Sequence, residues 1–251
     1  MTNPNELTVL LNNRGVAYLE MGNYAKAFAL FRDALRNTMA NLRETTESEA
    51  QDEEVPQLSH KDCPEVWKNK GMEAFADLKY LPRLSSYGPV NSEYLFSEGI
   101  TLMEEEDAYS PNKLVDVSVA SSIVLFNLAL IHHLKGLKDN SSKYLIKAES
   151  FYQKSFALLA ETGLLLGRTG NPVIDFVAMA LLNNAAQVGR ELCHSEQSKQ
   201  HFTELLAIAL QVNAASYGDC SSPVARFLDK TKMACLLNAM CLSEQTLAAA
   251  A

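Results

Sequence analysis

The chain has 251 residues, of which 47% are hydrophobic and 21% are charged, and these ordinary values suit either one large globular domain or a repeat array. The formal net charge of -8 argues against a protein that binds nucleic acid through phosphates alone, because such contacts need a basic surface. The sequence has no run of 18 apolar residues and no basic, apolar leader, so we expect neither a membrane span nor a signal peptide.

Two helices are predicted at the start of the chain, in residues 1–42. Asn3 and Pro4 are typical of a helix start, since asparagine caps the first turn and proline suits its first position. We expect the first helix to end at Gly22. The second helix should begin after Asn23 and run to about residue 42.

Residues 43–112 are predicted to form an acidic and irregular insertion. The stretch 44–54 contains six acidic residues and no basic one, which is more typical of a solvated linker than of an acidic interaction tail. Residues 64–79 have the pattern of a short helix. Residues 93–103 alternate loosely and are expected to be extended or to form a short hairpin. An insertion of this length is either disordered or functional.

Helical periodicity returns after the insertion. Residues 113–215 are predicted to hold two further helix pairs, with the first pair turning near Asn140 and the second opening at Pro172. Residues 222–250 then have the pattern of a last helix, which would cover the exposed face of the third pair.

Small and large residues stand at fixed spacings in the first pair. The pattern L-x3-G-x2-Y is formed by Leu11, Gly15 and Tyr18, and the pattern A-x3-F-x2-A by Ala27, Phe31 and Ala34. This stretch resembles a tetratricopeptide repeat, in which small residues let two antiparallel helices approach closely. Ala129 and Ala185 take the place of Gly15 in the later pairs. The resemblance implies an all-α, right-handed superhelix of antiparallel helix pairs.

An asparagine stands two residues before the small residue in each first helix, as Asn13, Asn127 and Asn183. In the family that the chain resembles, the first helices line a concave groove, and in some members asparagines there hold a bound peptide. A carboxamide suits this role because it offers a donor and an acceptor to any peptide backbone. The other interpretation is that each asparagine bonds to a backbone group within its own repeat. Both interpretations stay open at this point.

Two basic residues, Lys135 and Arg190, follow on the same stripe as the asparagines. They would give the groove a positive character suited to an acidic tail or a terminal carboxylate. The alternative is that both are solvated charges at helix ends. Asn12 and Met179 occupy the places where the family's carboxylate clamp needs basic residues, so chaperone-tail binding is not assigned.

No catalytic or metal-binding pattern stands out in the sequence. Cys193, His194 and His201 are the nearest candidates, but they match no known ligand spacing, and the glycines near residue 167 lack the lysine of a phosphate loop. We therefore expect no enzyme activity, no metal and no cofactor. The five cysteines lack a disulfide pattern and indicate a reducing compartment, so we expect a cytoplasmic or nuclear protein.

The sequence thus predicts a non-catalytic scaffold or adaptor that binds a peptide or a partner subunit in a concave groove. No nucleic-acid or membrane partner is expected. The alternative is a structural subunit of a larger assembly, whose groove is filled by its own insertion, residues 43–112. The identity of the partner and the oligomeric state stay open.

Overall fold

The computed structural model describes residues 4–49, 96–102, 113–161 and 172–212, together with residues 231–233, 235, 236 and 238. These residues contain helices and no strand, so the predicted all-α class is confirmed. The helices are α1 (Pro4–Glu20), α2 (Tyr24–Glu49), α4 (Lys113–Lys138), α5 (Ser142–Glu161), α6 (Pro172–Glu191) and α7 (Ser195–Gln211).

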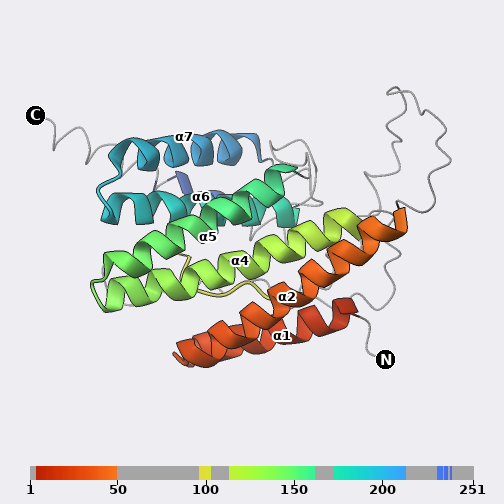
Figure 1. Ribbon diagram of the computed structural model, residues 1–251. Helices are drawn as coiled ribbons and strands as arrows, with labels where there is room; N and C mark the ends of the chain where they lie inside the picture. Colours follow the sequence, from red (N-terminus) through yellow and green to blue (C-terminus); the bar gives the residue numbers. More distant parts are fainter. Residues whose placement is uncertain are drawn as a thin grey trace, which may run out of the picture.

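The helices form three antiparallel pairs that lie one above another, α1 with α2, α4 with α5, and α6 with α7 (Figure 1). Neighbouring pairs meet where α2 packs against α4 and where α5 packs against α6. The first helices of the pairs are also in contact, α1 with α4 and α4 with α6. The right-handed superhelical path stays a prediction.

Small residues at the helix contacts explain the close packing. A Cβ atom added to Gly15 would lie only 2.5 Å from Cε1 of Phe31, so this glycine is needed where α1 meets α2. Ala129 and Ala185 are also buried, which confirms that the small residues of all three pairs face the core. A similar close contact recurs at Gly136 of α4, where an added Cβ atom would lie 2.7 Å from Cδ2 of Leu145.

The three pairs turn in the same way. Each has one residue with a positive φ angle after the first helix, namely Gly22 at 72°, Asn140 at 46° and Cys193 at 60°. In each turn the next N–H group donates to a carbonyl five residues earlier, as from Asn23 to Tyr18 at 2.8 Å. This left-handed conformation suits glycine and asparagine, whereas it strains the backbone at Cys193.

Parts of the predicted insertion differ from the structure. Helix α2 continues to Glu49, so residues 44–49 of the expected linker are helical. Glutamate has a good helix propensity, and neither glycine nor proline interrupts this stretch. Residues 96–102 form neither helix nor strand and bend at Glu98, so they contain no hairpin strand. The helix predicted at 64–79 lies outside the described residues.

The predicted last helix is described only in part, at residues 231–233, 235, 236 and 238, which are helical. Cys235 is fully buried in the core cluster, and Nζ of Lys232 donates to the carbonyl oxygen of Val212 at 3.0 Å. These contacts place the residues against the third pair. The remainder of 222–250 lies outside the described part of the chain.

One stretch within the described residues, Val117–Lys138 of α4, is long and apolar enough to cross a membrane. In this structure 78% of its apolar window is buried among the other helices. Helices α1, α2, α5 and α6 all contact α4. The apolar composition is therefore that of a central core helix.

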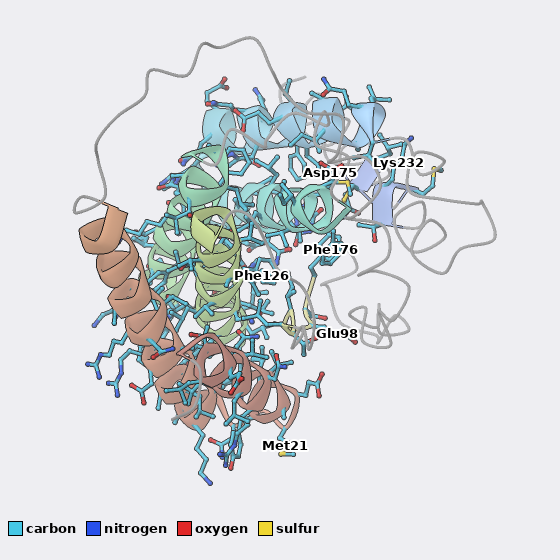
Figure 2. The ribbon with its side chains drawn as sticks, turned by 90° about the vertical axis from the view of Figure 1, so that its right-hand side faces the viewer. Met21, Glu98, Phe126, Asp175, Phe176 and Lys232 are labelled. Carbon is cyan, nitrogen blue, oxygen red and sulfur yellow. The ribbon has the colours of Figure 1, made fainter. Side chains whose placement is uncertain are left out.

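Segment 96–102 crosses one side of the helix array (Figure 1). The view turned by 90° shows Glu98 of this segment on the same side of the molecule as Phe176 of α6 (Figure 2).

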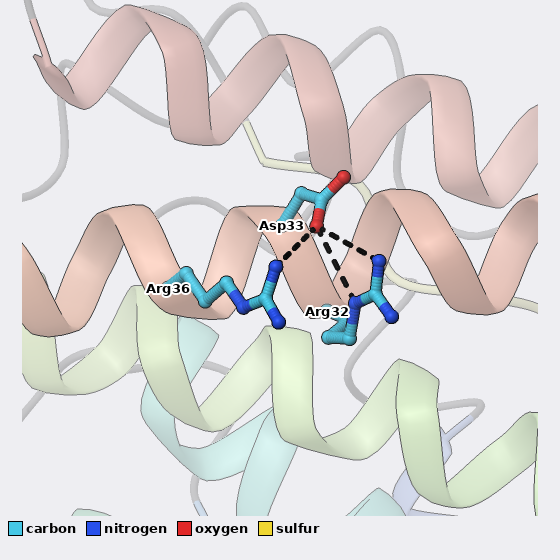
Figure 3. A network of polar contacts seen from close by, with 3 residues as sticks. All are labelled: Arg32, Asp33 and Arg36. Carbon is cyan, nitrogen blue, oxygen red and sulfur yellow. Dashed lines mark hydrogen bonds and ion pairs between the residues drawn. The ribbon is translucent and has the colours of Figure 1, made fainter.

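An exposed face of α2 carries ordinary surface charges, where Oδ1 of Asp33 lies 3.4 Å from nitrogens of both Arg32 and Arg36 (Figure 3). Such exposed ion pairs contribute little to stability.

The strained turn at Cys193 leads to a first prediction. Cys193→Gly should raise the free energy of unfolding by about 1 kcal/mol, because glycine adopts the left-handed conformation without steric strain. Urea denaturation measures this change. Asn140→Gly is the matched control and should have a smaller effect, since asparagine already tolerates a positive φ angle. A destabilised Cys193→Gly variant would contradict the prediction.

Candidate functional site

Segment 96–102 is the feature of the structure that carries most information about function. Leu102 bonds to α1, Ile100 to α1 and α4, and Phe96 to α6, so this short piece of chain touches the first helix of every pair. It runs from the third pair to the first, opposite to the order of the pairs in the sequence. The bonds come from asparagine side chains on those helices.

The central bond partner is Asn127 of α4. Its Oδ1 atom accepts a hydrogen bond from the Ile100 N–H group at 2.8 Å, and its Nδ2 atom donates to the Ile100 carbonyl oxygen, also at 2.8 Å. Asn127 is completely buried, and Ile100 is only 6% exposed. One carboxamide therefore satisfies both backbone groups of one residue, away from water.

The same two-bond pairing occurs near both ends of the segment. Asn13 accepts from the Leu102 N–H group at 2.8 Å and donates to its carbonyl oxygen at 2.7 Å. Asn184 accepts from the Phe96 N–H group at 3.0 Å and donates to its carbonyl oxygen at 3.1 Å. The paired backbone residues are separated by even numbers of positions. An extended chain turns such residues toward one side, which explains the match.

Asn12 joins the two pairings at the first and second helix pairs. It accepts a hydrogen bond from Nδ2 of Asn127 at 2.9 Å and donates to the Ile100 carbonyl oxygen at 3.0 Å and to Oδ1 of Asn13 at 3.2 Å. Asn12 is completely buried. Its bonds fix the orientation of both neighbouring carboxamides, so the site is held in shape by a connected network. We call Asn12, Asn13, Asn127 and Asn184 the carboxamide surface.

The network continues into the core beneath Asn184. Nδ2 of Asn184 also donates to the Tyr152 hydroxyl at 3.2 Å, and Nδ1 of His133 lies 3.3 Å from the same hydroxyl. Burial raises the pKa of Tyr152 well above its usual range, while the bond from Asn184 acts in the opposite direction. Burial lowers the pKa of His133 from 6.5 to about 3. Both groups are thus neutral at pH 7 and act as hydrogen-bonding supports.

The side chains of the segment add packing to the backbone bonds. The ring of Phe96 meets the ring of Phe176 edge to face, with centroids 6.0 Å apart. A Cβ atom added to Gly99 would lie 2.9 Å from Cγ2 of Val16 and 3.3 Å from Oδ1 of Asn127. The segment therefore approaches α1 and α4 as closely as a glycine allows.

Only two of the three predicted groove asparagines bond to segment 96–102. Asn13 and Asn127 pair with the segment, whereas Asn183 donates to Oδ1 of Asn184 and accepts from Nδ2 of Asn238 at 2.8 Å. In the third pair the bonds to the segment come from the neighbouring Asn184. The spacing of the small residues did not single out Asn12 and Asn184. Both belong to asparagine doublets, Asn12-Asn13 and Asn183-Asn184, and these doublets are a sequence signal that would have included them.

The two predicted basic residues make contacts within their own parts of the fold. Nζ of Lys135 lies 4.5 Å from the centre of the Tyr144 ring on α5, and the pKa of Lys135 is raised by its hydrogen bond to Tyr144. Nη2 of Arg190 lies 3.7 Å from Oε1 of Glu191, and both side chains are exposed. A role for Lys135 and Arg190 in ligand binding stays a prediction.

The histidine and cysteine candidates do not form a metal site within the described residues, where no group of three potential ligands comes together. Nδ1 of His194 lies 3.1 Å from Oε1 of Glu149, so this histidine links the start of α7 to α5. Cys193 has a free thiol at the surface.

The buried pairing at Ile100 leads to a second prediction. Asn127→Ala should lower the free energy of unfolding by about 2 to 4 kcal/mol, because two buried backbone groups lose their partner. Chemical denaturation measures the loss of stability, and hydrogen exchange measures the loss of protection at the Ile100 amide. Asn23→Ala is the control, since Asn23 only accepts from the Lys26 N–H group at an exposed helix start and should cost about 1 kcal/mol. Equal losses in the two variants would count against the buried network.

The buried His133 leads to a third prediction. Its pKa is about 3 in the folded protein against 6.5 as the reference value, so below pH 6.5 the unfolded chain binds a proton that the folded chain does not. Its contribution to stability is complete above pH 6.5 and decreases toward pH 3. At pH 5 the loss should be about 2 kcal/mol. His133→Gln should reduce the stability difference between pH 7.5 and pH 5 by this amount, and an unchanged difference would contradict the assignment.

Comparison with known proteins gives one match. The family model of the tetratricopeptide repeat matches residues 9–41, which lie in the α1–α2 pair. No curated protein and no solved structure matches the chain. The second and third pairs repeat the antiparallel arrangement and the turn of the first. The described part of the chain is thus an array of helix pairs, of which the first is a tetratricopeptide-like repeat.

Proposed function

We propose that this protein is a non-catalytic scaffold or adaptor, and that it binds an extended peptide segment of a partner on the carboxamide surface. Tetratricopeptide repeats in general are modules for protein–protein interaction. The observation that supports the finer proposal is the two-bond pairing of Asn13, Asn127 and Asn184 with the backbone of an extended segment.

The pairing suits a protein that binds peptides. An extended ligand carries unpaired N–H and C=O groups along its length, and a carboxamide satisfies one of each. The three carboxamides come from three different helix pairs, so a ligand must be extended over several residues to meet all of them. The spacing of the helix pairs therefore favours ligands with an extended backbone.

In this structure the surface is occupied by the chain's own residues 96–102. A partner peptide would have to displace this segment, which is present at a high effective concentration because it is tethered. The apparent dissociation constant of the partner peptide is then its intrinsic value divided by the fraction of molecules in which the segment has left the surface. The segment therefore acts as a competitor that sets a threshold for partner binding.

The second candidate is a structural subunit whose surface is permanently filled by this segment. The burial of Ile100 and the complete burial of Asn127 favour it, because such a well-packed segment resembles a core element. In this case the segment fastens the three pairs together, and partners bind to the outer faces of the helices.

Native-state hydrogen exchange separates the two candidates. For the adaptor, the Ile100 and Leu102 amides should exchange through an opening at least about 2 kcal/mol less costly than that of the Leu130 amide in the centre of α4. The segment then leaves its site while the helices stay folded. Equal opening free energies for the three amides would favour the structural subunit.

Peptide selection then tests the binding role. The full chain carrying Phe96→Ala and Ile100→Ala keeps every carboxamide but loses two side chains that hold the segment, and its fold is checked by circular dichroism. We expect random displayed peptides to be selected on this variant. Adding Asn13→Ala should weaken the selected peptides about tenfold or more. Adding Asn23→Ala is the matched control and should have no effect, and failure to select any peptide would contradict the proposal.

A further inference from the structure

We infer that the carboxamide surface prefers partner peptides with the pattern Phe-x-x-Gly-Ile-x-Leu, in which an aromatic residue is followed three positions later by glycine and two spaced aliphatic residues. This inference rests on the proposed function and names the class of ligand. It is argued from the segment that occupies the surface, residues 96–102, because any competitor has to replace its contacts.

The glycine position is the most restrictive. A Cβ atom at residue 99 would lie 2.9 and 3.2 Å from the two methyl carbons of Val16. Val16 is buried, and a branched side chain in a helix has one preferred rotamer, so it cannot move aside easily. The same Cβ atom would approach Oδ1 of Asn127, which is held by the Ile100 N–H group. A side chain larger than hydrogen therefore disturbs both the packing and the backbone pairing.

The apolar positions follow from burial. Ile100 is almost completely buried, and its backbone is held by Asn127 and Asn12. Phe96 and Leu102 are half-buried and pack against the hydrophobic core cluster, with Phe96 also meeting Phe176. These side chains stand at the positions whose backbone groups pair with the carboxamides, so side-chain contacts and backbone bonds specify one register.

One of the positions in between, residue 97, is tolerant. Ser97 is exposed, so its side chain is not selected by packing. The pattern thus combines general recognition of an extended backbone with side-chain selection at four positions. A partner that matches it would satisfy the same carboxamides that now hold the chain's own segment.

A synthetic, fluorescently labelled peptide with the sequence of residues 94–104 tests the inference. It is titrated against the full chain carrying Phe96→Ala and Ile100→Ala, and binding is followed by fluorescence anisotropy. We expect saturable binding. In the peptide, Gly99→Val should weaken binding at least tenfold, whereas Ser97→Val is the matched control and should leave it within twofold. Equal binding of the Gly99→Val peptide would overturn the inference.

The wild-type chain provides a second measurement that does not depend on the folding of the variant. An excess of the unlabelled peptide should accelerate hydrogen exchange at the Ile100 amide of the protein, and the Gly99→Val peptide should not. No acceleration by either peptide, even at concentrations far above those that saturate the variant, would count against displacement and so against the inference.

Other outcomes separate this inference from the proposed function. Selected peptides that bind through the carboxamides but lack the glycine and aliphatic pattern would overturn the inference and leave the proposed function standing. The absence of any peptide binding would defeat both. If light scattering shows that the wild-type chain dimerises and the peptide dissociates the dimer, the ligand is a second copy of this chain, and the inference about a separate partner is wrong.

Discussion

The structure depends on buried amide groups that satisfy one another. An extended segment inside a helical protein has no helix or sheet to bond its backbone, and unpaired backbone groups are costly when water is excluded. Asn127 removes this cost at Ile100, and Asn12 holds the neighbouring carboxamides in position. Without the asparagines the backbone of the segment would be unpaired against α1, α4 and α6, and without the segment the asparagines would keep only their bonds to one another and to Tyr152.

This mutual dependence explains why polar residues stand in the middle of otherwise apolar helices. Asparagine is an unfavourable helix residue, and α4 is the most apolar stretch of the described chain. Asn127 nevertheless lies at its centre, completely buried, because the backbone of the segment bonds to both its donor and its acceptor. The helix pairs supply the hydrophobic stability, while the carboxamides decide what lies on the surface of the first helices.

Much of this arrangement could be predicted from the sequence, because the spacing of residues that are close in the sequence indicates the helix pairs. The contact between Gly15 and Phe31, and the start of α6 at Pro172, follow from patterns within a few residues. The alternative in which the insertion fills the groove named residues 43–112 as a whole, but the segment within it and its bonds could not be predicted in the same way. Its bonds to the first and third pairs join residues 88 or 89 positions apart, as between Phe96 and Asn184, and those to Asn127 join residues 27 apart, and no periodicity encodes such distances. The segment meets Asn184 and not Asn183. Consecutive helix residues point about 100° apart, so this choice depends on how α6 is oriented about its own axis, which spacing alone does not determine.

The direction of the segment also has a consequence for synthesis on the ribosome. Phe96 leaves the exit tunnel long before Asn184, which is its partner in the third helix pair. The first two pairs can form before Asn184, the last partner of the segment, has been synthesised. The segment can therefore bond to α1 and α4 before α6 is made, and its last backbone pairing forms only when the third helix pair has folded.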